Sequence, residues 1–394
     1  MKRKKLVNIG RTYFNSIAYP LLNKGNVPMW THLWVTRRCN LNCGYCYVHD
    51  ENYPEMNTVD MKRAIKHIKD VLGCHLIAIM GGEPLIRKDL PELISYMTDN
   101  NIYSFLTTNG TLLNEKMLYK LGEAELDFLE ISIDGVGESN VSKKCGKKIV
   151  SNLETAIDIA LNIYNIELSI NMTITKQNYK EFDRLVRLIS GKGISITIGL
   201  YIPDMTSNKN LKDDPLAFTT AEDLIILNNL ANKIIKLKKK GFFIAIVNSY
   251  YKKWVSFMEN CIKIQNNKNN IKNLWKCQSG FNFLEVDCDG RIRYCSYLNK
   301  SIDSTLTIFD LDNGYYEKLK PEIQNMLKFC NFRCFADCFF QVSWIRKHPF
   351  KFSRKFFLRH ISHLINEMND IELKQRKEQA KINLRQKYQY FLNN

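Results

Sequence analysis

Six short apolar runs, separated by segments of helical periodicity, dominate the chain between residues 31 and 201. Each run joins aliphatic, β-branched and aromatic side chains, which is typical of buried parallel strands. They cover residues 32–36, 75–80, 103–108, 128–133, 167–174 and 194–201. In residues 61–73, apolar side chains recur on one helical face, and residues 115–123 and 180–190 repeat this pattern. The chain therefore alternates predicted strands with predicted helices.

Six strand–helix units in series predict right-handed crossovers and an α/β fold with a parallel sheet, curled into a full or partial barrel. In such folds, chemistry gathers at the carboxyl ends of the strands. Three unusual stretches follow the first three predicted strands: a cysteine-rich turn at 39–46, "GGEP" at 81–84 and "TTNGT" at 107–111. We therefore expect a functional site at this end of the sheet.

The residue pattern of the chain changes after the predicted barrel. Residues 202–220 are rich in turn formers and read as a connector, and a helix is expected over 221–240. Residues 275–338 combine short strands, turns and six cysteines, and residues 339–366 contain no acidic side chain. The predicted organisation is a basic N-terminal segment (1–29), a barrel (30–220), a helical connector (221–274), a cysteine-rich domain (275–340) and a basic helical tail (341–394).

Composition adds a strong charge bias. The formal net charge of +17 favours acidic partners such as phosphate groups, anionic lipid headgroups or nucleic acid, although a solvated basic surface is an equally simple explanation. The N-terminus lacks the apolar core of a signal peptide, and no apolar run is long enough to span a bilayer. We therefore expect a cytoplasmic protein, in which the twelve cysteines point to metal or redox chemistry rather than disulfides.

The cysteine-rich turn contains Cys39, Cys43 and Cys46, spaced as C-x₃-C-x₂-C. A structural zinc site needs four ligands, whereas three thiolates on an iron–sulfur cubane leave one iron open. On spacing alone, a zinc site that borrows a further ligand such as His49 remains an alternative.

The residues around the three cysteines favour an iron–sulfur cluster over a zinc site. "CNLNCGYC", with Tyr45 before the third cysteine, resembles the signature of the radical S-adenosylmethionine (radical SAM) enzymes. "MGGEP" at 80–84, "TTNG" at 107–110, "SIDG" at 132–135 and "NMTITKQN" at 171–178 resemble further segments of that family, in the same order and at strand ends. The resemblance covers residues 30–202 and implies a partial (β/α)₆ TIM-like barrel. It also implies a set of SAM-binding candidates: Tyr45, Gly81, Gly82, Glu83, Pro84, Asn109, Ser132, Asp134 and Asn171.

What the resemblance implies about activity is specific. Cys39, Cys43 and Cys46 would hold a [4Fe-4S] cluster whose open iron binds SAM, with Glu83 orienting SAM and with Ser132 and Asp134 as further contacts. One electron from a reductant such as flavodoxin or ferredoxin would cleave SAM. The resulting 5′-deoxyadenosyl radical would remove a hydrogen atom from the substrate.

A second cysteine set resembles the SPASM and Twitch extensions that follow some radical SAM barrels. "CQSGFNFLEVDCDGRIRYC" at 277–295 contains a predicted hairpin turn at Gly290, and "CNFRCFADC" follows at 330–338. The resemblance implies one auxiliary [4Fe-4S] cluster, although the spacing departs from the full SPASM pattern and a zinc-stapled subdomain is the alternative. The candidate ligands are Cys277, Cys295, Cys330, Cys334 and Cys338. The other cysteines are interpreted as ordinary thiols, namely Cys74, Cys145, Cys261 and Cys288.

Both ends of the chain mix basic and aromatic side chains, which suits anionic lipid surfaces, or RNA, or simply a solvated exterior. This pattern adds peripheral contact with the inner face of the membrane to the hypotheses. We rank peptide or protein modification first, and modification of a lipid or another small molecule second. RNA modification and a non-catalytic zinc-stapled binding protein rank lower, and a nucleic-acid partner is not expected because no RNA-binding module is recognisable.

Overall fold

The structure is a computed structural model in which residues 28–46, 48–137, 139, 142–203, 210–266, 274, 282–293, 306–312 and 314, with a few single positions up to 345, are described. The described strands form one sheet in the order β6-β5-β4-β3-β2-β1-β7-β8. Their bounds are β1 Trp30–Thr36, β2 Leu76–Gly81, β3 Tyr103–Thr108, β4 Phe128–Ser132, β5 Glu167–Ile174, β6 Ser195–Leu200, β7 Phe283–Val286 and β8 Ile292–Arg293.

All neighbouring pairs in the sheet are parallel except β7 and β8, which are antiparallel. The six predicted strands are therefore confirmed, with ends shifted by two residues at most. Within the described residues β6 and β8 do not pair with each other, so the sheet is an open, partial barrel. The predicted α/β fold is confirmed.

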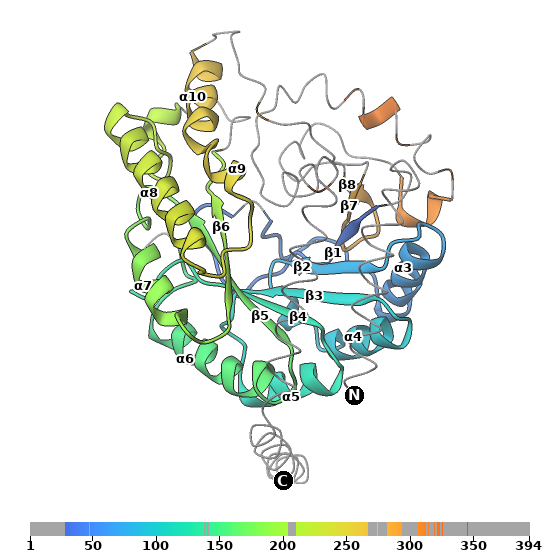
Figure 1. The fold of residues 1–394 in the computed structure, drawn as a ribbon. Helices are drawn as coiled ribbons and strands as arrows, with labels where there is room; N and C mark the ends of the chain where they lie inside the picture. Colours follow the sequence, from blue (N-terminus) through green and yellow to red (C-terminus); the bar gives the residue numbers. More distant parts are fainter. Residues whose placement is uncertain are drawn as a thin grey trace.

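Helices follow the strands in alternation and lie around the outside of the curved sheet (Figure 1). The α-helices of the described residues are α3 Thr58–Asp70, α4 Leu90–Asp99, α5 Glu115–Glu123, α6 Lys147–Ala156, α7 Glu181–Ile189, α8 Ala221–Lys239, α9 Asn248–Tyr251 and α10 Trp254–Gln265. A π-helical turn, Ile157–Leu161, extends α6, and short 3₁₀ turns cover Pro84–Ile86, Leu211–Asp213 and Ile308–Asp310.

Side-chain caps explain where several helices begin. Asn57 accepts a hydrogen bond from the backbone N–H of Asp60, so α3 starts three residues before the apolar pattern does. Asn114 caps α5, and Thr220 forms a reciprocal capping box with Asp223 at the start of α8. The expected helix over 221–240 is thereby confirmed almost to the residue.

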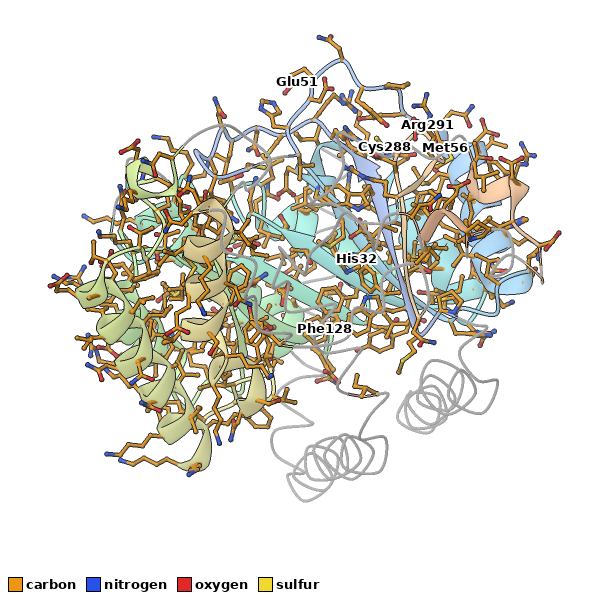
Figure 2. All side chains as sticks on the ribbon, turned by 90° about the horizontal axis from the view of Figure 1, so that it is seen from above. His32, Glu51, Met56, Phe128, Cys288 and Arg291 are labelled. Carbon is orange, nitrogen blue, oxygen red and sulfur yellow. The ribbon has the colours of Figure 1, made fainter. Side chains whose placement is uncertain are left out.

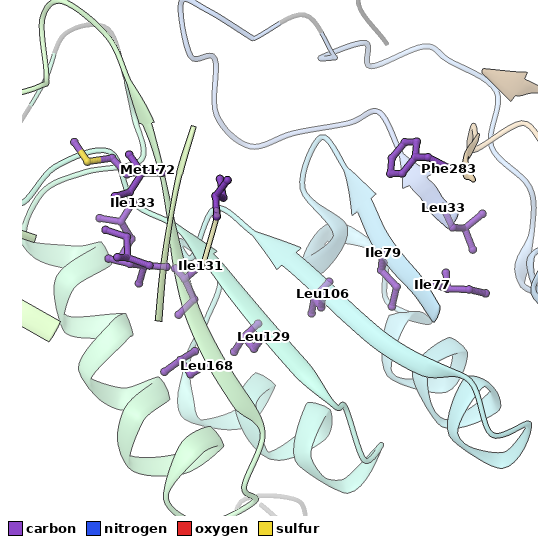
Figure 3. Packing of buried hydrophobic residues seen from close by; sticks show 14 of the residues in the cluster. Leu33, Ile77, Ile79, Leu106, Leu129, Ile131, Ile133, Leu168, Met172 and Phe283 are labelled. Atoms are coloured by element: carbon purple, nitrogen blue, oxygen red, sulfur yellow. The ribbon is translucent and has the colours of Figure 1, made fainter. Parts of the chain in front are cut away.

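The main core lies between the sheet and these helices. Alternate side chains of each strand face the helices, as the two-residue period of a strand requires. Figure 3 shows Ile77 and Ile79 of β2, Leu106 of β3 and Leu129 of β4 in successive strands, and all four are fully buried. This arrangement leaves the carboxyl ends of the strands free to carry loops.

The predicted hairpin at Gly290 is confirmed, because β7 and β8 pair across a turn in which Gly290 has a φ of +89°. Its place in the fold was not predicted. β7 runs parallel to β1, with Trp30 opposite Phe283 and Leu33 opposite Val286. The hairpin thus extends the barrel sheet.

Several predictions concern residues outside the described part. They are Cys277, Cys295, Cys330, Cys334 and Cys338, together with almost all of the two basic ends. Among the described residues, no helix has the length and apolar character needed to cross a membrane.

Candidate functional site

The loop that follows β1 contains the three predicted cluster ligands. Cys43 is buried, Cys39 is half-buried and Cys46 is exposed, and all three are free thiols. The backbone N–H of Cys46 donates to the carbonyl of Cys43 at 2.9 Å, which closes a tight turn between the last two cysteines. The loop leaves the carboxyl end of β1 beside the ends of β2 and β3.

Glu83 is a buried junction between the loops that follow β2 and β3. Its Oε1 accepts hydrogen bonds from the backbone N–H of Leu85 at 3.0 Å and the hydroxyl of Thr108 at 2.7 Å. Its Oε2 accepts from the backbone N–H of Asn109 at 2.7 Å. Burial raises the pKa of Glu83, and these donors partly oppose that rise. The carboxylate is therefore engaged within the protein, so its predicted direct role toward SAM stays a prediction.

Asn109 connects this junction to the first cysteine. Its side-chain nitrogen Nδ2 lies 3.8 Å from Sγ of Cys39 and 2.9 Å from Oδ1 of Asn40. The backbone N–H of Leu41 also points at Sγ of Cys39, at 3.4 Å. Burial raises the pKa of the Cys39 thiol, while the two N–H donors favour its thiolate form. Hydrogen bonds to a ligand sulfur are one of the factors that set the reduction potential of an iron–sulfur cluster.

Gly82 lets the loops after β1 and β2 approach each other. A Cβ at Gly82 would lie 2.3 Å from the carbonyl oxygen of Arg38 and 2.5 Å from that of Arg37. The adjacent backbone is hydrogen-bonded across the same contact, from Gly82 N to Thr36 O at 2.9 Å and from Glu83 N to Arg38 O at 2.8 Å. Gly82 was named as a SAM-binding candidate, and the structure shows that its missing side chain makes room for the backbone of the cysteine loop.

Asp134 binds the cysteine loop from the other side. Its carboxylate accepts hydrogen bonds from the Tyr45 hydroxyl, from Oγ of Ser142 at 2.6 Å and from the backbone N–H of Thr173 at 2.9 Å. Nζ of Lys144 lies 3.8 Å from the same carboxylate. Burial raises the pKa of Tyr45. Burial alone would lower the pKa of Lys144, but the charge of Asp134 raises it overall, so Lys144 is a half-buried cation at neutral pH.

The segment 142–145 is the part of the site that sequence reasoning missed. The backbone N–H of Lys143 points at Sγ of Cys43 at 3.4 Å, and the carbonyl of Lys144 accepts from Asp134 N at 2.7 Å. The only sequence signal was a pair of lysines among 57 Lys and Arg residues, which is no signal in itself. The chain must fold before this pair is distinguished from the others.

The remaining SAM-binding candidates lie at or near the carboxyl ends of neighbouring strands. Ser132 of β4 is the register partner of Asn171 of β5. Asn171 Nδ2 lies 3.5 Å from the carboxylate of Glu130, and Pro84 opens the 3₁₀ turn after β2. Together with Gly81, the predicted residues from β1 to β5 meet at one edge of the sheet.

The donor set fits an iron–sulfur cluster better than the zinc alternative. In the described part of the chain, no three His, Cys, Asp or Glu side chains are grouped as ligands of a single metal ion. His49, the proposed extra zinc ligand, has its Nε2 2.6 Å from Oε1 of Glu51. A cubane binds each thiolate at a different iron. The loop offers three separate thiols for this purpose, and backbone N–H groups are directed at the sulfurs of Cys39 and Cys43.

Comparisons with known proteins agree with this geometry. A family model described as the radical SAM superfamily matches residues 34–189. An uncharacterized protein of Methanocaldococcus jannaschii is 32% identical over 213 residues, which are 52% of this chain and 72% of that protein. Fe-coproporphyrin III synthase of Methanosarcina barkeri is 28% identical over 228 residues, 56% of this chain and 54% of the synthase. The PqqA peptide cyclase of Bradyrhizobium diazoefficiens is 27% identical over 165 residues, 41% of this chain and 43% of the cyclase.

Two of these three relatives are matched over only about half of their length. Among solved structures, SuiB of Streptococcus suis bound to its precursor peptide SuiA has a TM-score of 0.55 at 16% sequence identity. The similarity covers 77% of this chain and 68% of SuiB, and at this identity it shows a shared fold.

Proposed function

Because the chain belongs to the radical SAM superfamily, we propose that it is an enzyme that binds a [4Fe-4S] cluster through Cys39, Cys43 and Cys46 and cleaves S-adenosylmethionine reductively. When bound, the cluster supplies the electron that converts SAM to methionine and a 5′-deoxyadenosyl radical, which removes a hydrogen atom from an unreactive C–H bond of the substrate.

One observation carries this proposal. The cysteine loop is held on both sides by residues of the other motifs: Asn109 reaches Cys39 from the loop after β3, and Asp134 binds Tyr45 from the loop after β4. Motifs that are far apart in the sequence therefore converge on the three thiols. Chance matches to short motifs would not be expected to do so.

The chain's own residues then have distinct tasks. Glu83 holds the loops after β2 and β3 together, which fixes Asn109 against the first cysteine. Lys144 places a positive charge beside Asp134 and next to the cysteine loop, where a ligand with a carboxylate would be favoured. These groups orient the loops of the site and balance charge there. A reductant such as flavodoxin or ferredoxin would supply the electron to the cluster.

For the substrate, we propose a peptide or protein. The similarity to a PqqA peptide cyclase supports this class. The longer similarity to Fe-coproporphyrin III synthase favours the alternative, a small molecule, and a lipid at the membrane surface belongs to the same alternative. The proposed location is the cytoplasm, with the basic ends in contact with the inner membrane face if the substrate is a lipid.

The cysteine-rich segment supports a further cofactor proposal. We assign an auxiliary [4Fe-4S] cluster to ligands drawn from Cys277, Cys295, Cys330, Cys334 and Cys338, which lie outside the described residues. Anaerobically reconstituted protein should then contain about eight irons rather than four.

The test of the main proposal is anaerobic incubation of the reconstituted protein with SAM and dithionite. The expected product is 5′-deoxyadenosine, and a triple Cys39→Ala, Cys43→Ala, Cys46→Ala variant should form none. Deoxyadenosine from the triple variant would refute the assignment. Addition of peptide or lipid fractions of a cell extract then tests the substrate class, because the correct fraction should accelerate product formation.

A further inference from the structure

The two ends of the cysteine loop, residues 36–56, are joined by one acidic side chain. Glu55 accepts hydrogen bonds from the Thr36 hydroxyl and from Arg38, whose Nε and Nη2 lie 3.1 and 3.0 Å from its two carboxylate oxygens. The backbone N–H of Asp50 also donates to the carbonyl of Arg37 at 3.2 Å. The two ends of the loop therefore lie side by side.

The turn of the β7–β8 hairpin binds the first end of this loop. Asp287 accepts hydrogen bonds from Nε of Arg37 at 3.2 Å and from its Nη2, and it accepts another from Nη1 of Arg293 at 3.0 Å. The side chains of Asp287, Arg293 and Arg37 are 1%, 6% and 15% exposed. Asp287 is thus a buried carboxylate between two guanidinium groups, one of which lies two residues before the first cysteine.

The same turn binds the other end of the loop. The backbone N–H of Met56 donates to the carbonyl of Cys288 at 2.6 Å, and Sγ of Cys288 lies 3.6 Å from the carbonyl of Pro54. The guanidinium of Arg37 lies 3.5 Å from the ring centroid of Tyr53, which connects the two ends. Figure 2 shows Met56, Cys288 and Arg291 close together above the sheet.

We propose that the hairpin turn 287–290 is a clamp that fixes the conformation of the cysteine loop, and that Asp287 is its positioning residue. The clamp deepens the proposed function and rests on it for its purpose, since it presents the three thiols to a cluster. Asp287 is 250 positions from Arg37, and Cys288 is 234 positions from Pro54. A chain that ends before the hairpin would keep all three cysteines and the GGEP motif but lose this support.

The chemistry of the contact makes the clamp rigid. Two-point binding of Arg37 to a carboxylate fixes both direction and distance. A buried carboxylate that loses its charge leaves two guanidinium groups without a counterion, and breaking such a network is strongly unfavourable. Arg291, the residue that follows the turn, provides a matched control, because its side chain is 51% exposed and forms an ion pair with the neighbouring Asp289.

The experiment compares Asp287→Asn, Arg37→Gln and the control Arg291→Gln in the full-length protein. Hydrogen exchange followed by mass spectrometry reports the opening of residues 37–56, and a chelator reports the rate of iron release from reconstituted protein. We expect exchange in the loop and iron release to be at least about tenfold faster in the first two variants, with exchange in β3–β6 unchanged. Arg291→Gln should behave like the wild type.

Wild-type exchange of the loop in both Asp287→Asn and Arg37→Gln would overturn the clamp, as would an equal acceleration across β3–β6. If Asp287→Asn fails to fold, Arg37→Gln decides alone, because it leaves the Arg293–Asp287 pair in place. If the wild type assembles no cluster, the proposed function fails, while hydrogen exchange still tests the clamp.

Discussion

Oε2 of Glu83 accepts a hydrogen bond of 2.7 Å from the backbone N–H of Asn109, which joins the loop after β2 to the loop after β3. Because the side chain of Asn109 reaches Sγ of Cys39, this contact extends to the cysteine loop. A fully buried carboxylate therefore aligns three loops at one edge of the sheet.

Replacing Glu83 with Gln should destabilise the protein by about 1–3 kcal/mol, since an amide nitrogen cannot accept the hydrogen bonds that the second carboxylate oxygen accepts. At least one buried donor among Leu85 N–H, Thr108 O–H and Asn109 N–H would lose its partner. Urea unfolding measures the change. Glu92→Gln, at a side chain 58% exposed on α4, is the matched control, and equal stability of the two variants would contradict the role of Glu83.

Gly82→Ala should be among the most damaging small substitutions in the chain. The new methyl group would meet the backbone carbonyls of Arg37 and Arg38 at 2.3–2.5 Å, and backbone cannot move aside as a side chain can. We expect a loss of about 3 kcal/mol or more and poor iron incorporation. At Gly137 the nearest atom is the Arg184 side chain at 3.5 Å, so Gly137→Ala should be tolerated. Thermal unfolding and iron analysis would show whether the two differ.

Lys144→Met should weaken SAM binding about tenfold or more. The change removes the cation 3.8 Å from the buried carboxylate of Asp134, whose negative charge is then uncompensated beside the proposed SAM site. Lys143→Met removes the adjacent lysine, whose side chain is exposed and whose backbone N–H keeps its contact with Cys43. Isothermal titration of the anaerobic holoprotein with SAM compares them. The interpretation fails if both variants bind SAM like the wild type.

The network around Asp287 predicts a defined pH dependence. Burial alone would raise the pKa of Asp287, but Arg37 and Arg293 hold it below its ordinary range. Its contribution to stability should therefore be complete above the unfolded-state pKa of about 4 and should disappear as the pH falls through the lower folded-state pKa.

Urea unfolding at a series of pH values tests this. The stability difference between wild type and Asp287→Asn should be constant near neutral pH and should shrink in the acid range. Burial alone would lower the pKa of Arg37, but Asp287 raises it overall, and burial raises the pKa of the neighbouring Tyr53, so neither of these two groups titrates in the acid range. A difference that grows as the pH falls would contradict the assignment.

Local pattern was sufficient for much of the fold. The six barrel strands could be placed within two residues because a buried strand is a short apolar run, and the turn at Gly290 was readable because a hairpin turn favours a residue that accepts positive φ. The cysteine spacing and the GGEP segment likewise identified the family, since both are contiguous in the chain. Helix α3 began earlier than its apolar pattern because a polar cap, Asn57, set its start.

Tertiary structure alone decided the rest. Lys144 became a half-buried partner of the buried Asp134, and Asp287 a partner of Arg37 across 250 residues. β7, which lies within the predicted cysteine-rich domain, paired with β1 of the barrel sheet. Periodicity, turns and caps are properties of neighbouring residues and can be read along the chain. The contribution of a charged side chain to stability depends on which distant group lies beside it in the folded chain. It also depends on whether burial removes water from the pair.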